Sequence, residues 1–118
     1  MNRMKEIIQK LQNWGCDIKG ALERMLNNED FYIECLYTVL EDTNFDELEK
    51  NLKKGNIHEA FEHAHTLKGV LGNMGLTLMY QKTIEIVEPL RIGSDEQTLE
   101  NYRDLKNMKD HLQSILKA

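Results

Sequence analysis

The amino-acid sequence predicts an all-α protein: an antiparallel four-helix bundle with additional short N-terminal helices. Apolar residues recur three and four positions apart along most of the chain, which is the spacing of helices that bury one face. Strong helix formers dominate, and the chain has one proline. No stretch alternates apolar and polar residues for long enough to predict a strand. Because no linker or low-complexity segment divides the 118 residues, we expect a single domain over residues 1–118.

Two short helices are expected within residues 1–27. The apolar stripe of residues 4–14 predicts the first helix, and Gly15 ends it. Asp17 is placed to cap a second helix that runs to about Leu26. This N-terminal segment can form a helical cap over one end of the bundle, or it can serve as a dimerisation element. We favour the cap, and we therefore expect a monomer.

Residues 28–117 are expected to form the four helices of the bundle. The first is a long helix over residues 28–54, which Gly55 ends. The dipeptide Thr43-Asn44 is a poor helix former in its middle, so the helix can bend or break there. Pro89 lacks a backbone donor and should kink its helix or end it early. The other three helices are predicted over residues 57–74, 76–92 and 95–117.

The composition narrows the class of protein. Hydrophobic residues make up 41% and charged residues 30% of the chain, as in soluble globular proteins. No apolar run approaches the length of a membrane span, and no signal peptide opens the chain. The net charge of −5 argues against a nucleic acid or an anionic membrane as partner. Cys16 and Cys35 are few and far apart, which favours reduced thiols in a cytoplasmic protein over a disulfide.

The most informative stretch is residues 64–76. On a helix, His65 lies well off the centre of the apolar face, toward water. Lys68, Gly69 and Gly72 follow it at i+3, i+4 and i+7 and line the strip beside it. A glycine inside a helix costs ~1 kcal/mol relative to alanine. Two of them beside an exposed histidine indicate that bare backbone is needed there, so that something bulky can reach the imidazole.

Within this stretch stand Ala64, the run His65-Thr-Leu-Lys68-Gly69, and Gly75-Leu76. Together these residues resemble the signature of histidine-containing phosphotransfer (HPt) domains. The upstream run from Asn28 to Asp42 is also similar to the long helix before the histidine helix in that family, and the resemblance covers roughly residues 17–116. It implies a protein that carries a phosphoryl group on a helix-borne histidine, between receiver-domain aspartates of a phosphorelay.

The resemblance also assigns roles along the strip. His65 would be the phosphoacceptor, since a neutral imidazole nitrogen is a good nucleophile. Lys68 would place an ammonium group near the phosphoryl oxygens, one turn away. Gly69 would let the receiver approach, and Gly72 would serve either the same end or close helix packing. The receiver, of a response regulator or of a hybrid histidine kinase, would bring Mg²⁺ and its own lysine. We expect no cofactor on this chain.

Other candidates for chemistry are weaker. His63 lies ~160° round the helix from His65 and fits a structural or surface role better. His58 and His111 have no matching surroundings. Glu62 and His65 form one Glu-x-x-His pair, as in di-iron bundles, but the chain has no second such pair, so we expect no metal site. No glycine-rich phosphate loop is present, which favours a phosphocarrier over an ATP-dependent kinase.

The chain departs from the family at one position. Several HPt domains carry a Gln or Glu on the next helix that hydrogen-bonds the other imidazole nitrogen. Counting without gaps from His65, that position is Val87, with Gln81 and Glu88 nearby but not aligned. Backbone or water can then set the tautomer of His65. The departure fits a carrier fed by receivers better than a module coupled to a kinase.

Phe61 lies one turn before His65, at the edge of the apolar face. It belongs either to a receiver-docking patch or to the core. For the whole chain two functions stay open: a phosphorelay carrier, and an adaptor that docks receivers without phosphotransfer. The intact motif at His65 favours the carrier, because an adaptor needs no nucleophile. A start at Met1 and a short tail after Leu116 favour a free-standing protein over a part of a larger kinase.

Overall fold

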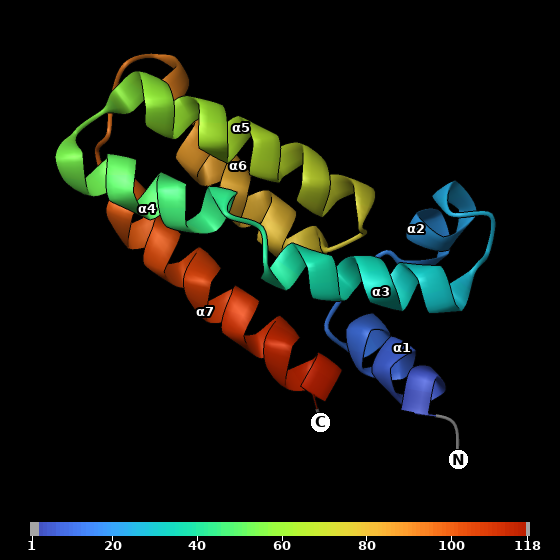
Figure 1. The fold of residues 1–118 in the computed structure, drawn as a ribbon. Coiled ribbons are helices and arrows are strands. Elements are labelled where there is room, and N and C mark those ends of the chain that lie inside the picture. Colours follow the sequence, from blue (N-terminus) through green and yellow to red (C-terminus); the bar gives the residue numbers. More distant parts are fainter. Residues whose placement is uncertain (1–2, 118) are drawn as a thin grey trace.

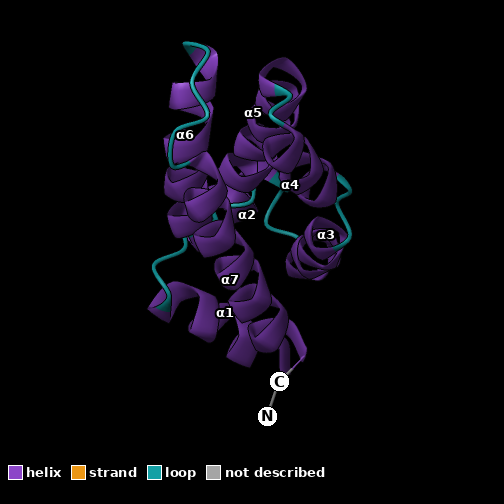
Figure 2. Ribbon diagram, turned by 90° about the vertical axis from the view of Figure 1, so that its left-hand side faces the viewer, coloured by secondary structure: helices purple, strands orange, loops and turns teal. Residues whose placement is uncertain are grey.

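The computed structural model describes residues 3–117, and every regular element in that range is a helix (Figure 1). The predicted all-α class is therefore confirmed, and Figure 2 shows helices and loops alone in the described part. The helices are α1 (Arg3–Asn13), α2 (Ile18–Arg24), α3 (Glu29–Leu40), α4 (Asn44–Lys54), α5 (Ile57–Asn73), α6 (Thr77–Arg91) and α7 (Thr98–Lys117).

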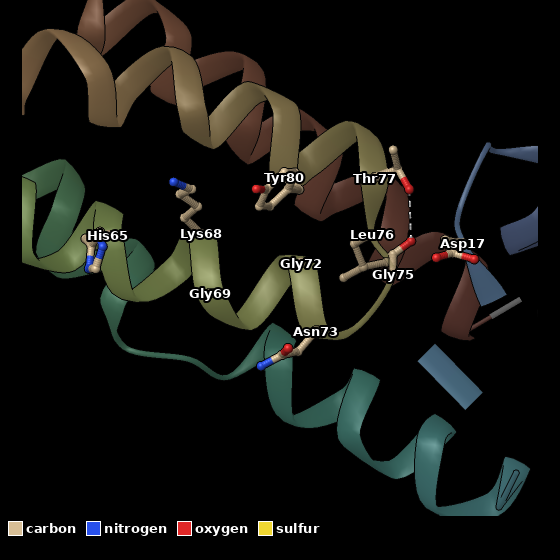
Figure 3. Close-up of a pocket in the computed structure, with 10 residues that line it drawn as sticks. All are labelled: Asp17, His65, Lys68, Gly69, Gly72, Asn73, Gly75, Leu76, Thr77 and Tyr80. Atoms are coloured by element: carbon tan, nitrogen blue, oxygen red, sulfur yellow. Dashed lines mark hydrogen bonds between the residues drawn. The ribbon is translucent and has the colours of Figure 1, made fainter. Parts of the chain in front are cut away.

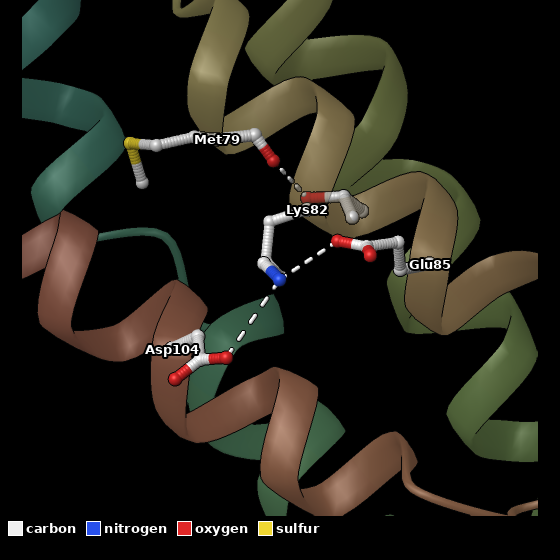
Figure 4. Close-up of polar contacts among 5 residues, drawn as sticks. Met79, Lys82, Glu85 and Asp104 are labelled. Atoms are coloured by element: carbon white, nitrogen blue, oxygen red, sulfur yellow. Dashed lines mark hydrogen bonds and ion pairs between the residues drawn. The ribbon is translucent and has the colours of Figure 1, made fainter.

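Helices α4 to α7 form the four-helix bundle. Helix α5 packs against both α4 and α6, and α7 closes the bundle against α6 and α4. The seam between them is filled by side chains with almost no exposed surface, which is the apolar stripe expected from helical periodicity. An ion pair links α6 to α7. The ammonium of Lys82 in α6 lies 2.8 Å from the carboxylate of Glu85 in the same helix and 3.7 Å from the carboxylate of Asp104 in α7 (Figure 4).

The helix predicted over residues 28–54, with a possible bend or break at Thr43-Asn44, is broken there into α3 and α4, and only α4 belongs to the four-helix bundle. The break falls at the weak point that the sequence marks. The Asp42 carboxylate accepts hydrogen bonds from the backbone N–H of Asn44 at 2.8 Å and from its side-chain amide at 2.9 Å. Short polar side chains that bond the nearby backbone compete with the helix in this way. Helix α3 is thereby separated from the bundle helix α4 (Figure 1).

Helices α1, α2 and α3 gather at the end of the bundle where α7 finishes (Figure 1). The predicted cap residue Asp17 does accept a hydrogen bond from the backbone N–H of Gly20 at 3.0 Å. Helix α2 stops at Arg24 rather than near Leu26, because Leu26 and Asn27 take left-handed φ values of 55° and 58°. This tight turn leads directly into α3.

The remaining helix ends differ from the prediction by a few residues. Gly55 has the left-handed φ of 73° expected of a helix stop. Pro89 does not end α6 early, since it lies in the last turn, where the helix continues to Arg91. Helix α7 begins at Thr98 rather than at Asp95, because Gln97 has a φ of 59° and interrupts the helical path. None of the helices described is both long and apolar enough to cross a membrane.

Candidate functional site

His65 lies on the solvent side of α5. The residues that α5 buries are Ala60, Ala64, Leu67 and Leu71, one face of the helix. This register follows from the 3.6-residue period and leaves the His65 side chain exposed. Beside it, the α5–α6 pair borders a cavity of about 460 Å³ (Figure 3). The cavity is lined by Asp17, His65, Lys68, Gly69, Gly72, Asn73, Gly75, Leu76, Thr77 and Tyr80.

The four residues of the predicted strip, His65, Lys68, Gly69 and Gly72, all line this cavity. Lys68 extends from α5 into the space next to α6 (Figure 3). It forms no ion pair with any carboxylate among residues 3–117, in contrast to Lys82, which is held between two. An ammonium group without an acidic partner, one turn from His65, is available to an incoming anion.

The two glycines of the strip differ. A Cβ on Gly69 would meet no atom within 4 Å, so the backbone there borders open space. A Cβ on Gly72 would lie 3.1 Å from the ring of Tyr80. Of the two readings left open for Gly72, close packing between helices is therefore the one its surroundings favour. Gly69 keeps the environment that access for a partner requires.

Tyr80 is the aromatic residue of the cavity lining, and the sequence analysis did not place it at the site. It comes from α6, its ring lies close to Gly72, and it lines the cavity with Lys68 (Figure 3). Its hydroxyl makes no hydrogen bond to another residue of the described range. One feature of the sequence could have pointed to it. Tyr80 follows Gly72 by eight residues across the turn at Gly75, and this spacing places the two residues opposite each other when α5 and α6 pack closely antiparallel.

The N-terminal helices hold the end of α5 that closes the cavity. The guanidinium of Arg24 donates hydrogen bonds to the carbonyls of Asn73 and Gly72 at 3.0 and 3.2 Å. The buried hydroxyl of Tyr32 donates to the Met74 carbonyl at 2.8 Å. The carbonyls of Asn73 and Met74, at the helix end where intrahelical donors run out, thus gain donors from α2 and α3, and the Gly72 carbonyl, which also accepts from the backbone N–H of Gly75, gains a further one. Both contacts fix the wall of the cavity opposite His65.

Val87, the residue that the count without gaps from His65 singles out, is fully buried in the core. The His65 ring makes no hydrogen bond with any residue that the structure describes. Its contact is with Phe61, whose ring centroid is 5.6 Å away with the two planes 20° apart. Phe61 is half-buried against the core, which is compatible with either of its two predicted roles. The nearby Glu88 pairs with Arg91 at 3.5 Å instead of reaching the imidazole.

Two of the other histidines, His63 and His111, contact residues away from the cavity. Nδ1 of His63 lies 2.7 Å from the side-chain oxygen of Asn44, and this contact joins α5 to the start of α4. His111 packs edge-on against Trp14, with ring centroids 4.7 Å apart. No group of three or more His, Cys, Asp or Glu side chains within residues 3–117 is arranged to hold a metal ion.

The site is thus an exposed histidine on a bundle helix, followed on the same face by the unpaired Lys68 and by the open backbone of Gly69. A family model described as "Hpt domain" matches residues 40–115, which is more than half of the chain. The chain therefore belongs to the Hpt domain family, whose members are phosphocarriers that interact with response-regulator receiver domains in phosphorelays. Searches of curated proteins and of solved structures give no match.

Proposed function

We propose that this chain is a phosphohistidine carrier, in which His65 accepts a phosphoryl group from one receiver aspartate and donates it to another. The observation that carries the proposal is the placement of His65, exposed at a cavity whose border holds the unpaired Lys68 and the open backbone of Gly69. An adaptor that only docks receivers would have no need for the nucleophile at His65. The partner is a receiver domain of a response regulator or a hybrid histidine kinase.

The transfer follows from ordinary phosphoryl chemistry. The unprotonated ring nitrogen of His65 attacks the phosphorus of an aspartyl phosphate in line with the leaving oxygen. The P–O bond to the aspartate breaks, its carboxylate leaves with the bonding electrons, and a P–N bond forms. Lys68 offsets the charge on the phosphoryl oxygens from this side, and Mg²⁺ held by the receiver does so from the other. Donation to the next receiver is the same step in reverse.

The absence of a carboxylate at Val87 bears on which partner feeds His65. A carboxylate next to the imidazole favours a histidine that a kinase phosphorylates from ATP. Here no described side chain hydrogen-bonds the ring, and the aspartyl phosphate of a receiver is already a reactive donor. In this proposal the carrier works as a cytoplasmic monomer supplied by receivers.

Incubation with a phosphorylated receiver tests the proposal. We expect acid-labile phosphate on the wild-type chain and on His63→Gln, and none on His65→Gln. His63→Gln is the matched control, since it changes a histidine two residues away on the same helix that faces Asn44. Label that persists in His65→Gln would remove the assignment. Receiver binding without any label on the wild-type chain would show an adaptor instead.

A further inference from the structure

The imidazole of His65 has an aromatic neighbour in place of a hydrogen-bond partner. The Phe61 ring lies one helical turn before it, with centroids 5.6 Å apart and planes within 20° of parallel. No described side chain or carbonyl hydrogen-bonds either ring nitrogen, and the position from which a Gln or Glu would do so is the buried Val87. The one contact that the structure gives this exposed ring, among the described residues, is with Phe61.

Phe61 is itself held in place from two sides. Its inner edge packs against the core, which leaves the ring half-buried. The guanidinium carbon of Arg91, at the end of α6, lies 5.2 Å from the centroid of the Phe61 ring, the geometry of a cation–π contact. Arg91 is in turn paired with Glu88 at 3.5 Å. The aromatic platform for His65 is thus anchored to the neighbouring helix.

We propose that Phe61, held by Arg91, is a positioning residue for His65: it stacks on the imidazole and orients it for in-line attack, in the place of a hydrogen-bonding side chain. Stacking contacts the face of the ring and leaves both nitrogens at its edge uncovered. The ring plane is then restricted while a nitrogen stays open to phosphorus. Orientation of this kind acts on the rate of the transfer step and not on receiver affinity. The kinetic part of this inference rests on the proposed function, whereas the structural part does not.

Nuclear magnetic resonance of the free protein tests the structural part. In the wild-type chain the ring protons of His65 should be shifted upfield by the Phe61 ring current and show cross-relaxation with Phe61. Phe61→Leu should abolish both effects, Phe61→Tyr should keep them, and Arg91→Gln should weaken them without touching the core. Val70→Ala, a half-buried change elsewhere on α5, serves as the control and should leave them unchanged. His65 signals that are identical in wild type and Phe61→Leu would overturn the proposal.

Single-turnover transfer from a phosphorylated receiver tests the kinetic part. At saturating receiver, Phe61→Leu should slow phosphorylation by roughly tenfold with an unchanged Kd, and Phe61→Tyr should restore the rate. A weakened Kd with a normal saturated rate would make Phe61 a docking residue and overturn the positioning role. If the wild-type chain accepted no phosphate, the proposed function would fail, while the resonance measurements would still decide whether Phe61 orients His65. Thermal melts of each variant verify that the compared proteins are folded.

Discussion

An alanine at Gly69 should stabilise the protein, because the glycine lies inside α5 with nothing where its Cβ would point. Replacing glycine by alanine in a helix interior is worth about 0.5–1 kcal/mol. No atom within 4 Å opposes the added methyl group, so most of this gain should be realised. For a chain of 118 residues, about 1 kcal/mol corresponds to a rise in Tm of about 4 °C. Thermal unfolding followed by circular dichroism measures it.

Gly72→Ala is the matched control in the same helix. It has the same gain in helix propensity, but its Cβ would lie 3.1 Å from the Tyr80 ring. Overpacking of this kind costs about 1 kcal/mol or more. We therefore expect Gly72→Ala to be less stable than Gly69→Ala, and close to or below the wild type. Equal stabilisation by the two alanines would refute the contrast between open and packed backbone.

Gly69→Gln separates stability from access. Glutamine is a good helix former, so the fold should be retained. Its side chain would fill the open space one turn from His65 and keep a receiver at a distance. Since a misplacement of ~1 Å can cost a hundredfold in rate, phosphotransfer should slow by at least roughly tenfold. A folded Gly69→Gln variant that transfers phosphate at the wild-type rate would show that this glycine has no role in access.

Three further outcomes are expected. Gly75→Ala should cost roughly 2–4 kcal/mol in urea denaturation, because Gly75 has a φ of 71° and its Cβ would overlap the Asp17 carbonyl. Arg24→Met should cost about 1 kcal/mol in the same assay, with a smaller loss at high salt, as two hydrogen bonds to the end of α5 disappear. Burial raises the pKa of the Cys16 thiol from 9.0 to about 11. The stability that comes from keeping this thiol protonated is therefore present below pH 9 and lost as the pH rises through 11. Between these two pH values the Tm of Cys16→Ser should fall less than the Tm of the wild type.

The helical strip at His65 could be predicted from spacing alone. Residues three and four apart share a face of a helix whatever the rest of the chain does, so Lys68 and Gly69 are placed by the period. Tyr80 could not be predicted in the same way, because its contact with Gly72 depends on how closely α6 crosses α5 after the turn. The Phe61–Arg91 contact likewise joins two helices and has no local signature.

The helix boundaries also divide into those that a single residue predicts and those that depend on packing. Gly55 and Asp17 act through their own backbone or side chain and were recognisable one residue at a time. The break between α3 and α4 is a competition between helix propagation and the hydrogen bonds that Asp42 makes to Asn44. The sequence marks the weak point, but the outcome depends on where α3 packs. The late start of α7 depends on a left-handed Gln97, which no composition rule anticipates.

The hydrogen bonds at the end of α5 bear on which truncated fragments of this protein would keep an intact site. The range that matches the family model begins at residue 40, after α2 and most of α3. A fragment that begins there would keep His65 and the bundle helices, yet it would lack the donors that Arg24 and Tyr32 supply to the carbonyls after Leu71. The turn that leads from α5 into α6 would lose its supports and the Tyr80 wall would loosen. A fragment that contains only the family-matched segment would thus keep the histidine on a helical bundle but lack the contacts that hold one wall of the cavity. Binding measured on such a fragment would underestimate the affinity of the whole chain for a receiver domain.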